Sequence, residues 1–241
     1  MDSGILYIVG TPIGNLQDIT LRALDTLKSV DLVLCEDTRV SRKLLSHYNI
    51  STRVESLHAH TNPEKISRII HQITTGTNAA LISDAGTPTI SDPGSLLLEA
   101  AWQAKIKIVP IPGPSAVTTA ISVSGFCDKG FLFLGFIPKK KGREKFLKKI
   151  TENDYPVVFF ESVHQIQKLL LQLQQILHPD RKILITRELT KLYETIFRGK
   201  IQDFNISDLG QIKGEFTIVI DKNPSTSFPP SLKLRRAGRT R

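Results

Sequence analysis

Short apolar runs alternate with amphipathic stretches along the first half of the 241-residue chain. The runs have the length of strands, and the stretches between them have helical spacing. Strands separated by helices run parallel, because each helix returns the chain to the same end of the sheet. The alternation predicts an α/β domain with strands at 5–9, 31–35, 53–57, 79–83 and 106–110, and helices near 20–29, 40–47, 63–75 and 94–104.

The second half carries another series of apolar runs, which predicts a second sheet. Its later strands have short connections, so we expect this sheet to be partly antiparallel and therefore mixed. The clearest helix is predicted over 162–177, with Ser162 as its cap and His164 in its first turn. We predict two α/β domains, at 1–112 and 113–222, facing each other across a cleft, and a basic, flexible tail at 223–241. The strands of the second sheet are expected at 131–136, 156–160, 182–186, 194–198 and 215–220.

Two loops rich in proline and glycine follow predicted strands of the first half, at 83–94 and 110–115. Glycine lets a ligand approach the backbone closely, and proline fixes a loop at low entropy. In open α/β sheets, ligands bind beyond the carboxyl ends of the strands. The loops therefore predict a ligand crevice. The glycines at 10 and 14 match neither a Walker loop nor a dinucleotide fingerprint, which disfavours an NTPase or a nicotinamide enzyme.

Charged residues also follow these strands, and each of them has two interpretations. Glu36 and Asp37 could orient a substrate or accept a proton. Alternatively, Asp37 could cap the next helix while Arg39 pairs with Glu36. Asp84 could bind an amine or ribose hydroxyls of a ligand, or could cap a turn as Asp92 could.

The net charge of +9 is concentrated in two segments, 139–149 and 233–241, and the rest of the chain is slightly acidic. Such local basicity indicates binding to a polyanion, although a solvated loop and a free tail would look the same. We find no metal-ligand spacing and expect no metal. The chain has no apolar run of membrane-spanning length, and its two cysteines are interpreted as reduced thiols, so we expect a cytoplasmic protein without a membrane segment.

The motifs, taken in order, resemble one family over about residues 4–221. They are similar to the small-subunit ribosomal RNA methyltransferase I family of the tetrapyrrole methylase superfamily. The resemblance implies two α/β domains with S-adenosylmethionine between them. It also implies 2′-O-methylation of a cytidine in the decoding region of 16S rRNA, within the small ribosomal subunit, by a homodimer. The segments that carry the resemblance are 6–16, 36–39, 83–88, 92–94, 112–116, 135–138, 187–191 and 213–215.

The resemblance also implies a set of cofactor-binding residues, namely Ile13, Asp84, Gly86, Thr87, Ile90, Pro112, Gly113, Phe160, Thr186 and Phe216. Methyl transfer to a hydroxyl needs a proton acceptor and groups that hold phosphate, for which the catalytic candidates are Glu36, Asp37, Arg39, Arg187 and Glu188. The local positive charge makes Lys139, Lys140, Lys141 and Arg143 the expected RNA-binding residues.

This chain departs from the family pattern at two places. Gln165 stands where relatives commonly have arginine, and we expect no small helical C-terminal region of the kind that relatives often carry. RNA docking would then depend on the basic segment and the tail. Two other functions remain open, a tetrapyrrole-type small-molecule methyltransferase and a non-catalytic RNA-binding factor on the same scaffold.

Overall fold

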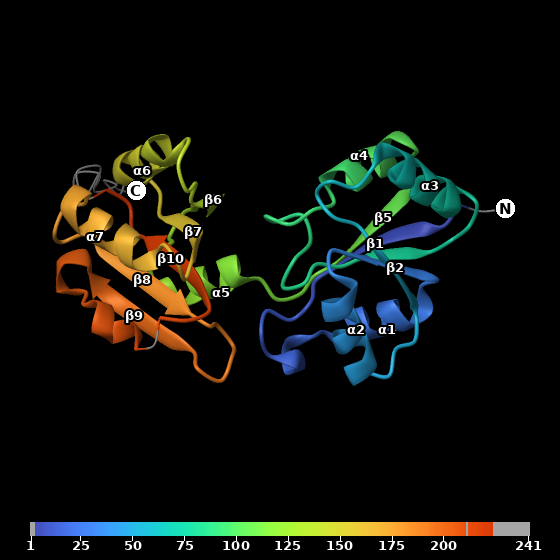
Figure 1. Ribbon diagram of the computed structural model, residues 1–241, viewed down its shortest axis with the longest axis horizontal. Coiled ribbons are helices and arrows are strands. Elements are labelled where there is room, and N and C mark those ends of the chain that lie inside the picture. Colours follow the sequence, from blue (N-terminus) through green and yellow to red (C-terminus); the bar gives the residue numbers. More distant parts are fainter. Residues whose placement is uncertain (1–2, 211, 224–241) are drawn as a thin grey trace, which may run out of the picture.

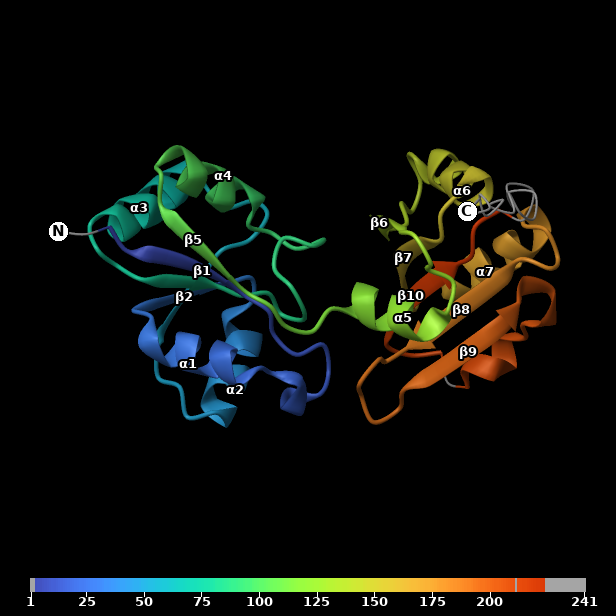
Figure 2. The same ribbon diagram turned by 180° about the vertical axis from the view of Figure 1, so that it is seen from behind.

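The computed structural model describes residues 3–210 and 212–223 and shows two lobes (Figure 1). The chain crosses between them in the segment that joins strand β5 (Lys107–Ile111) to helix α5 (Ala116–Ser124), which is visible from behind in Figure 2. The domain boundary that we predict after residue 112 falls inside this segment. The domain bounds themselves stay a prediction.

The first lobe contains a five-stranded sheet with the strand order β3-β2-β4-β1-β5. Every neighbouring pair is parallel, as the β/α alternation predicts. The sheet therefore collects the carboxyl ends of its strands, and the loops that follow them, at one edge. Besides β5, its strands are β1 (Ile5–Val9), β2 (Leu32–Cys35), β3 (Arg53–Ser56) and β4 (Ala79–Leu81).

Helices cover both faces of this sheet. A core that includes Leu27 and Leu45 packs α1 (Leu21–Ser29) and α2 (Thr38–His47) on one face. A core that includes Ile69 and Leu97 packs α3 (Pro63–Thr74) and α4 (Ser95–Gln103) on the other. The 3₁₀ turn η1 (Leu16–Asp18) precedes α1.

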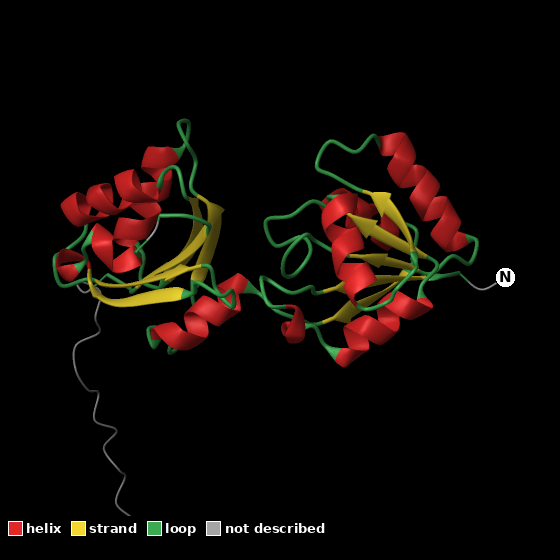
Figure 3. Ribbon diagram, turned by 60° about the horizontal axis from the view of Figure 1, so that its bottom comes forward, coloured by secondary structure: helices red, strands yellow, loops and turns green. Residues whose placement is uncertain are grey.

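The second lobe contains a five-stranded sheet with the strand order β6-β7-β10-β8-β9. Its first pair is parallel and the other three are antiparallel, so the predicted mixed sheet is confirmed. One core packs α5 on one face, and a larger core packs α6 (Arg143–Glu152) and α7 (Ile166–Ile176) on the other (Figure 3). The strands are β6 (Leu132–Phe136), β7 (Val157–Ser162), β8 (Lys182–Arg187), β9 (Thr195–Lys200) and β10 (Glu215–Ile220), and the 3₁₀ turns are η2 (Ile201–Asp203) and η3 (Ile206–Leu209).

The start of the long helix in the second lobe differs from the prediction. Ser162 does not cap a helix, because it is the last residue of β7 and pairs with Glu215 of β10. This pairing extends the strand, so the helix begins only at Ile166. His164 consequently lies in the turn before the helix and not in its first turn.

The basic segment 139–149 is only partly a loop. Helix α6 begins at Arg143 and buries Phe146 and Ile150, which are four residues apart and therefore on one helical face. The described helices include none that is long and apolar enough to cross a membrane. Apart from residue 223, the predicted basic tail lies outside the described residues.

Candidate functional site

A cavity of about 430 Å³, which we call cavity 1, lies between the two lobes. The first lobe contributes residue 13 and the loop at 85–92. The second lobe contributes the carboxyl ends of β6 and β7 and the start of β10, and the segment at 115–117 forms a further wall. Cavity 1 is thus located where the predicted crevice should be.

Hydrogen bonds join the loop after β1 to the loop after β4 at the wall of cavity 1. Thr11 and Gly86 exchange two backbone hydrogen bonds of 2.9 and 3.1 Å. The Thr11 hydroxyl also donates to the Ser83 carbonyl at 3.1 Å, and the Thr87 hydroxyl donates to the Pro114 carbonyl at 3.3 Å. Gly86 has a φ of +87°, which favours glycine. These contacts fix the side chain of Thr87 and the backbone of Gly86 at the cavity wall.

Asp92 lines cavity 1, although we predicted only a turn-capping role for it. Burial is the main cause that raises the pKa of this carboxyl to about 6, and the negative charge of Glu36 adds to it. A carboxylate held in this way is suited to bind a cationic group of a ligand. The sequence signal was present, since Asp92 ends the long loop before Pro93-Gly94.

Aromatic rings form the wall of cavity 1 on the second lobe. Gly135 has a φ of +67°, and the register of β6 shifts between Phe133 and Phe136. This irregularity leaves Phe136 61% exposed, with its ring centroid 5.2 Å from that of Phe160. The two rings are inclined by 56° to each other, and together with Phe216 they make this wall apolar and aromatic, as is usual for small-molecule sites.

Glu161 is a buried carboxylate in the same wall, with 4% exposure. Its Oε1 accepts a hydrogen bond from the Ser162 backbone N–H at 2.7 Å, and burial raises the pKa of the group. Arg143 lies 4.0 Å from its Oε2 and donates to Gln172 Oε1 at 2.8 Å. Arg143 is therefore turned inward, unlike the three exposed lysines that precede it at 139–141.

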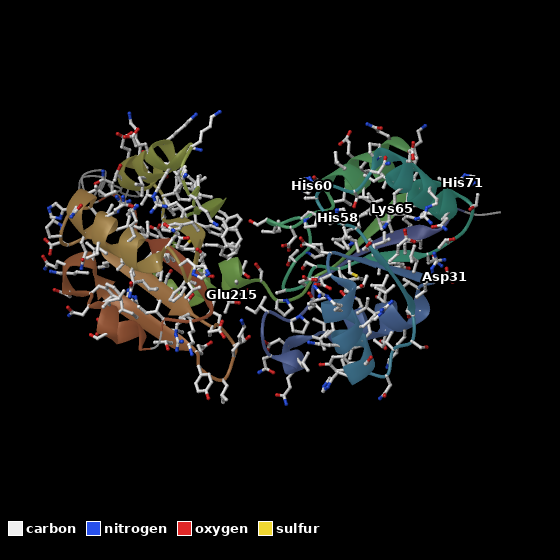
Figure 4. The ribbon with its side chains drawn as sticks, viewed as in Figure 1. Asp31, His58, His60, Lys65, His71 and Glu215 are labelled. Atoms are coloured by element: carbon white, nitrogen blue, oxygen red, sulfur yellow. The ribbon has the colours of Figure 1, made fainter. Side chains whose placement is uncertain are left out.

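A second cavity of about 330 Å³, cavity 2, adjoins the first and shares Ile13, Ala85 and Glu215 with it. Figure 4 shows Glu215 on the side of the second lobe that faces the first. Cavity 2 is bordered by the loop after β1, by one side of α2 and by Asp84 and Lys191. Burial raises the pKa of Asp84, whose Oδ1 accepts a hydrogen bond from the Asp37 N–H at 3.2 Å.

Asp37 and Arg39 form the start of α2. The Asp37 carboxylate accepts hydrogen bonds from the backbone N–H and the guanidinium of Arg39, which hold the pKa of this carboxyl at about 2. The capping interpretation is therefore the one that the contacts support, but Arg39 pairs with Asp37 and not with Glu36. Glu36 is exposed at the end of β2.

Arg187 and Glu188 shape the turn after β8 and line neither cavity. Arg187 is buried and donates to the Tyr193 carbonyl at 2.9 Å. Glu188 Oε1 accepts hydrogen bonds from Lys191 Nζ at 2.9 Å and from the Glu215 N–H at 3.0 Å. Both side chains are thus engaged in holding the backbone of the second lobe.

The residues predicted to bind the cofactor separate into three groups. Three of them line neither cavity, namely Thr186, Pro112 and Gly113. Thr186 is fully buried inside the sheet, where its hydroxyl donates to the Thr217 carbonyl at 2.8 Å. Pro112 and Gly113 lie in the segment that crosses between the lobes. Asp84 lines cavity 2 only. Six predicted residues line cavity 1, namely Ile13, Gly86, Thr87, Ile90, Phe160 and Phe216.

The polar groups at the two cavities are suited to organic ligands. The carboxylate of Asp92 lines cavity 1, and Asp84 and Lys43 line cavity 2. Within 3–210 and 212–223, no three His, Cys, Asp or Glu side chains gather in a way that could hold a metal ion.

Comparison with known proteins identifies the family. A family model described as Tetrapyrrole (Corrin/Porphyrin) Methylases matches residues 5–205, and the chain belongs to this family. Its fold is similar to that of uroporphyrin-III-C-methyltransferase from Thermus thermophilus, with a TM-score of 0.63 at 18% identity, covering 91% of this chain and 94% of the other. Diphthine synthase is also similar, with a TM-score of 0.67 at 16% identity and 90% of each chain covered.

The chain also has relatives at much higher identity. It is 45% identical over 228 residues to ribosomal RNA small subunit methyltransferase I of Haemophilus influenzae, covering 93% of this chain and 81% of that protein. It is 47% identical over 227 residues to the protein of the same name from Borrelia garinii subsp. bavariensis, covering 92% and 100%. Within the tetrapyrrole methylases, the chain therefore belongs to the ribosomal RNA small subunit methyltransferase I family.

Proposed function

We propose that this protein transfers the methyl group of S-adenosylmethionine to the 2′-hydroxyl of a cytidine in the decoding region of 16S rRNA. The observation that carries the proposal is the similarity of nearly the whole chain to ribosomal RNA methyltransferases at 45% and 47% identity. The two adjoining cavities between the lobes supply the space that a donor and an acceptor need.

Cavity 1 fits the methyl donor. Its volume lies within the usual range for small-molecule sites, and its walls are mainly apolar and aromatic. Phe136, Phe160 and Phe216 would hold the adenine ring, and the carboxylate of Asp92 would bind the ammonium group. When bound, S-adenosylmethionine supplies a methyl group that its sulfonium charge already activates.

Because the donor is activated, the protein mainly has to align the acceptor and receive its proton. Two of the predicted carboxylates are already engaged, since Asp37 pairs with Arg39 and Glu188 with Lys191. Glu36 remains from the predicted set, and Asp84 joins it because it faces a cavity. Each would be tested by substitution with its amide.

The exposed lysines Lys139, Lys140 and Lys141 support RNA binding by the second lobe. They follow β6 closely, and β6 ends at Phe136 on the wall of cavity 1. An RNA backbone held by these lysines would therefore pass the entrance of cavity 1. We do not include Arg143 in this surface, because its side chain is turned toward Gln172 and Glu161.

The experiment uses the purified full chain, labelled S-adenosylmethionine and small ribosomal subunits that lack the modification, followed by nucleoside mapping. We expect the label in one 2′-O-methylcytidine of the decoding region. Small subunits that already carry the modification are the matched control and should take up none. Label at another nucleotide, or only in a porphyrinogen-type substrate, would overturn the proposal. Binding to subunits without affinity for S-adenosylmethionine would favour a non-catalytic factor.

The cellular location and the oligomeric state belong to the same proposal. A ribosomal substrate implies a cytoplasmic enzyme, and the family resemblance implies a homodimer. Light scattering on the purified protein tests the homodimer, and a mass of one chain would exclude it.

A further inference from the structure

A cluster of positive charge lies on the first lobe, between the edge strand β3 and helix α3. The Glu55 carboxylate of β3 pairs with Arg53 at 3.3 Å and with Lys65 at 3.5 Å, and Arg68 of α3 pairs with it as well. Lys65 Nζ also donates to Ser56 Oγ, on the last residue of β3, at 3.2 Å. One carboxylate neutralises only one of the three cations that surround it, so the cluster keeps a positive charge.

The two arginines of the cluster keep most of their hydrogen-bonding capacity. The side chains of Arg53 and Arg68 are 62% and 52% exposed, and each contacts Glu55 through one guanidinium nitrogen. A guanidinium has five N–H donors, and its shape matches phosphate oxygens. In the described residues, the nearby Glu64 pairs with none of the three cations, and the segment 53–68 stays positive when its charge is counted. The cluster is therefore suited to bind an anion with several acceptor oxygens.

A hydrogen-bonded turn follows β3 and continues the surface of the cluster. The His58 N–H donates to Thr61 Oγ1 at 2.8 Å, and the Thr61 N–H donates to the His58 carbonyl at 2.9 Å. Leu57 and Thr61 are buried, which leaves His58 and His60 exposed between them. Figure 4 shows both histidines on the side of the first lobe that faces the second. The turn thus presents two imidazole rings in a fixed arrangement.

The cluster and the turn lie near the loops that line the cavities. All neighbouring strands of this sheet are parallel, so they end at one edge, and only β2 separates β3 from β4. Strands are about 4.8 Å apart, so the ends of β3 and β4 are about 10 Å apart. The loop after β4 lines cavity 1. An RNA strand whose target nucleotide reaches the cavities would therefore have its neighbouring nucleotides beside β3.

We propose that the cluster binds the phosphates of the RNA next to the target nucleotide, and that the two histidines contact its bases. This inference rests on the proposed function and adds a second RNA-binding surface to the lysines of the second lobe. Phosphate contacts fix the position of a nucleic acid, and unstacked RNA bases stack on aromatic rings, histidine included. The RNA is then held by both lobes. We call these five residues the first-lobe patch, namely Arg53, His58, His60, Lys65 and Arg68.

The first test measures the affinity of the full chain for small subunits that lack the modification, by fluorescence titration at several salt concentrations. Arg53→Ala combined with Arg68→Ala should lower the slope of log affinity against log salt by about 1.4 to 1.8 and weaken binding about tenfold. The matched control is Arg22→Ala combined with Lys28→Ala, which removes the same charge from α1 on the opposite face of the sheet. The control should bind as wild type does. Equal effects of the two double variants would show a general charge effect and overturn the inference.

Glu55→Gln tests the cluster with the opposite sign. The substitution removes the negative charge that competes with phosphate, so binding should become about twofold tighter. The melting temperature should fall slightly, because ion pairs between β3 and α3 are lost. If the cluster served only to hold β3 against α3, binding would be weaker or unchanged, and that result would overturn the phosphate contacts.

The histidines are tested by His58→Ala combined with His60→Ala. Binding should weaken about tenfold with a nearly unchanged salt slope at pH 8, because base stacking releases no counterions. Wild-type affinity of this variant would overturn the base contacts. In all variants the affinity for S-adenosylmethionine, measured by calorimetry, should be unchanged, and a lowered donor affinity would contradict a patch that contacts only RNA.

Protein-free 16S rRNA is the second probe. A patch that binds RNA should show the same loss of slope with this probe, because the electrostatic part of binding needs only the RNA backbone. A loss seen only with small subunits would assign the patch to a ribosomal protein and overturn the inference. The titrations need no methyl transfer, so wild type that binds subunits without methylating them would contradict the proposed function and not the patch.

Discussion

The backbones of Gly10 and Gly113 touch where the carboxyl ends of β1 and β5 meet. A Cβ on Gly10 would lie 2.8 Å from Gly113 Cα, and one on Gly113 would lie 2.9 Å from the carbonyl carbon of Gly10. The Gly10 N–H also donates to the Ile111 carbonyl at 3.0 Å. The loop after β1 thus packs directly against the start of the segment that crosses to the second lobe.

We predict that Gly113→Ala destabilises the protein by about 1–3 kcal/mol, the usual cost of an added methyl group in a tightly packed place. Urea unfolding measures this change. The control is Ser115→Ala in the same segment, because the Ser115 side chain makes no cap hydrogen bond and the substitution adds no atoms. Equal stability of the two variants would show that the close contact is relieved easily.

Glu188 should act on the structure and not on the chemistry. Its Oε1 holds Lys191 and the Glu215 N–H, and Gly214 packs against it so closely that a Cβ there would lie 2.2 Å from Oε1. We expect Glu188→Gln to keep single-turnover methyl transfer within a few-fold of wild type, because the amide oxygen preserves the bond to Glu215. Glu188→Ala should cost about 1–3 kcal/mol of stability. A loss of rate by orders of magnitude in Glu188→Gln would restore the catalytic interpretation.

Asp92 should make stability depend on pH. Its folded pKa of about 6 lies above the ordinary value of 3.8, so the folded state binds more protons between these two values. The free energy of unfolding therefore falls as pH rises from about 4 to about 6. Above about pH 6, Asp92 lowers it no further. We expect Asp92→Asn to be more stable than wild type at pH 8 by about 1–2 kcal/mol, less than the full shift implies because the group is only half-buried. The advantage should vanish near pH 4, and denaturant unfolding at both pH values checks it.

Arg181 should be a main stabilising residue of the second lobe. It is 3% exposed and donates to the carbonyls of Ile150, Thr151 and Asp221 at 2.7, 2.9 and 2.9 Å. Burial lowers its pKa to about 10. Arg181→Met leaves these carbonyls without their donor and should cost about 2–4 kcal/mol in urea unfolding. The neighbouring Lys182→Met, at an exposed position, is the control, and an equal effect of both would contradict this role.

The lysine run should set the salt dependence of RNA binding. Each phosphate contact contributes about 0.7 to 0.9 to the slope of log affinity against log salt. Replacing Lys139, Lys140 and Lys141 by alanine should therefore lower this slope by about two to three. Fluorescence titration of small subunits at several salt concentrations measures it, with Arg143→Ala as a comparison expected to change the slope little. A triple variant with wild-type slope and affinity would exclude the surface.

The strands and the parallel sheet of the first lobe could be predicted because local apolar spacing determines them. The same reasoning predicted a loop at 83–94 that lines cavity 1, because glycine and proline mark a rigid loop, and its binding of a ligand stays a prediction. It gave no bounds for the helix that follows the 110–115 loop, where α5 lies. It treated 139–149 as a loop, because lysines hide the short spacing between Phe146 and Ile150.

Sequence patterns alone were sufficient to predict the α/β architecture, the mixed second sheet and the family, whereas the part of the chain that binds ligands stays a prediction. Which polar groups face a cavity depends instead on tertiary packing. Thr186 ends the strand predicted at 182–186 and was expected at the cofactor from the family resemblance, but it is buried within the sheet. Asp92 looked like a turn residue, but it lies on the cavity wall. The physical reason is that spacing along one strand or helix fixes local conformation, whereas the partners of a side chain come from segments distant in sequence, such as Glu161 beside Arg143 and Glu188 beside Glu215.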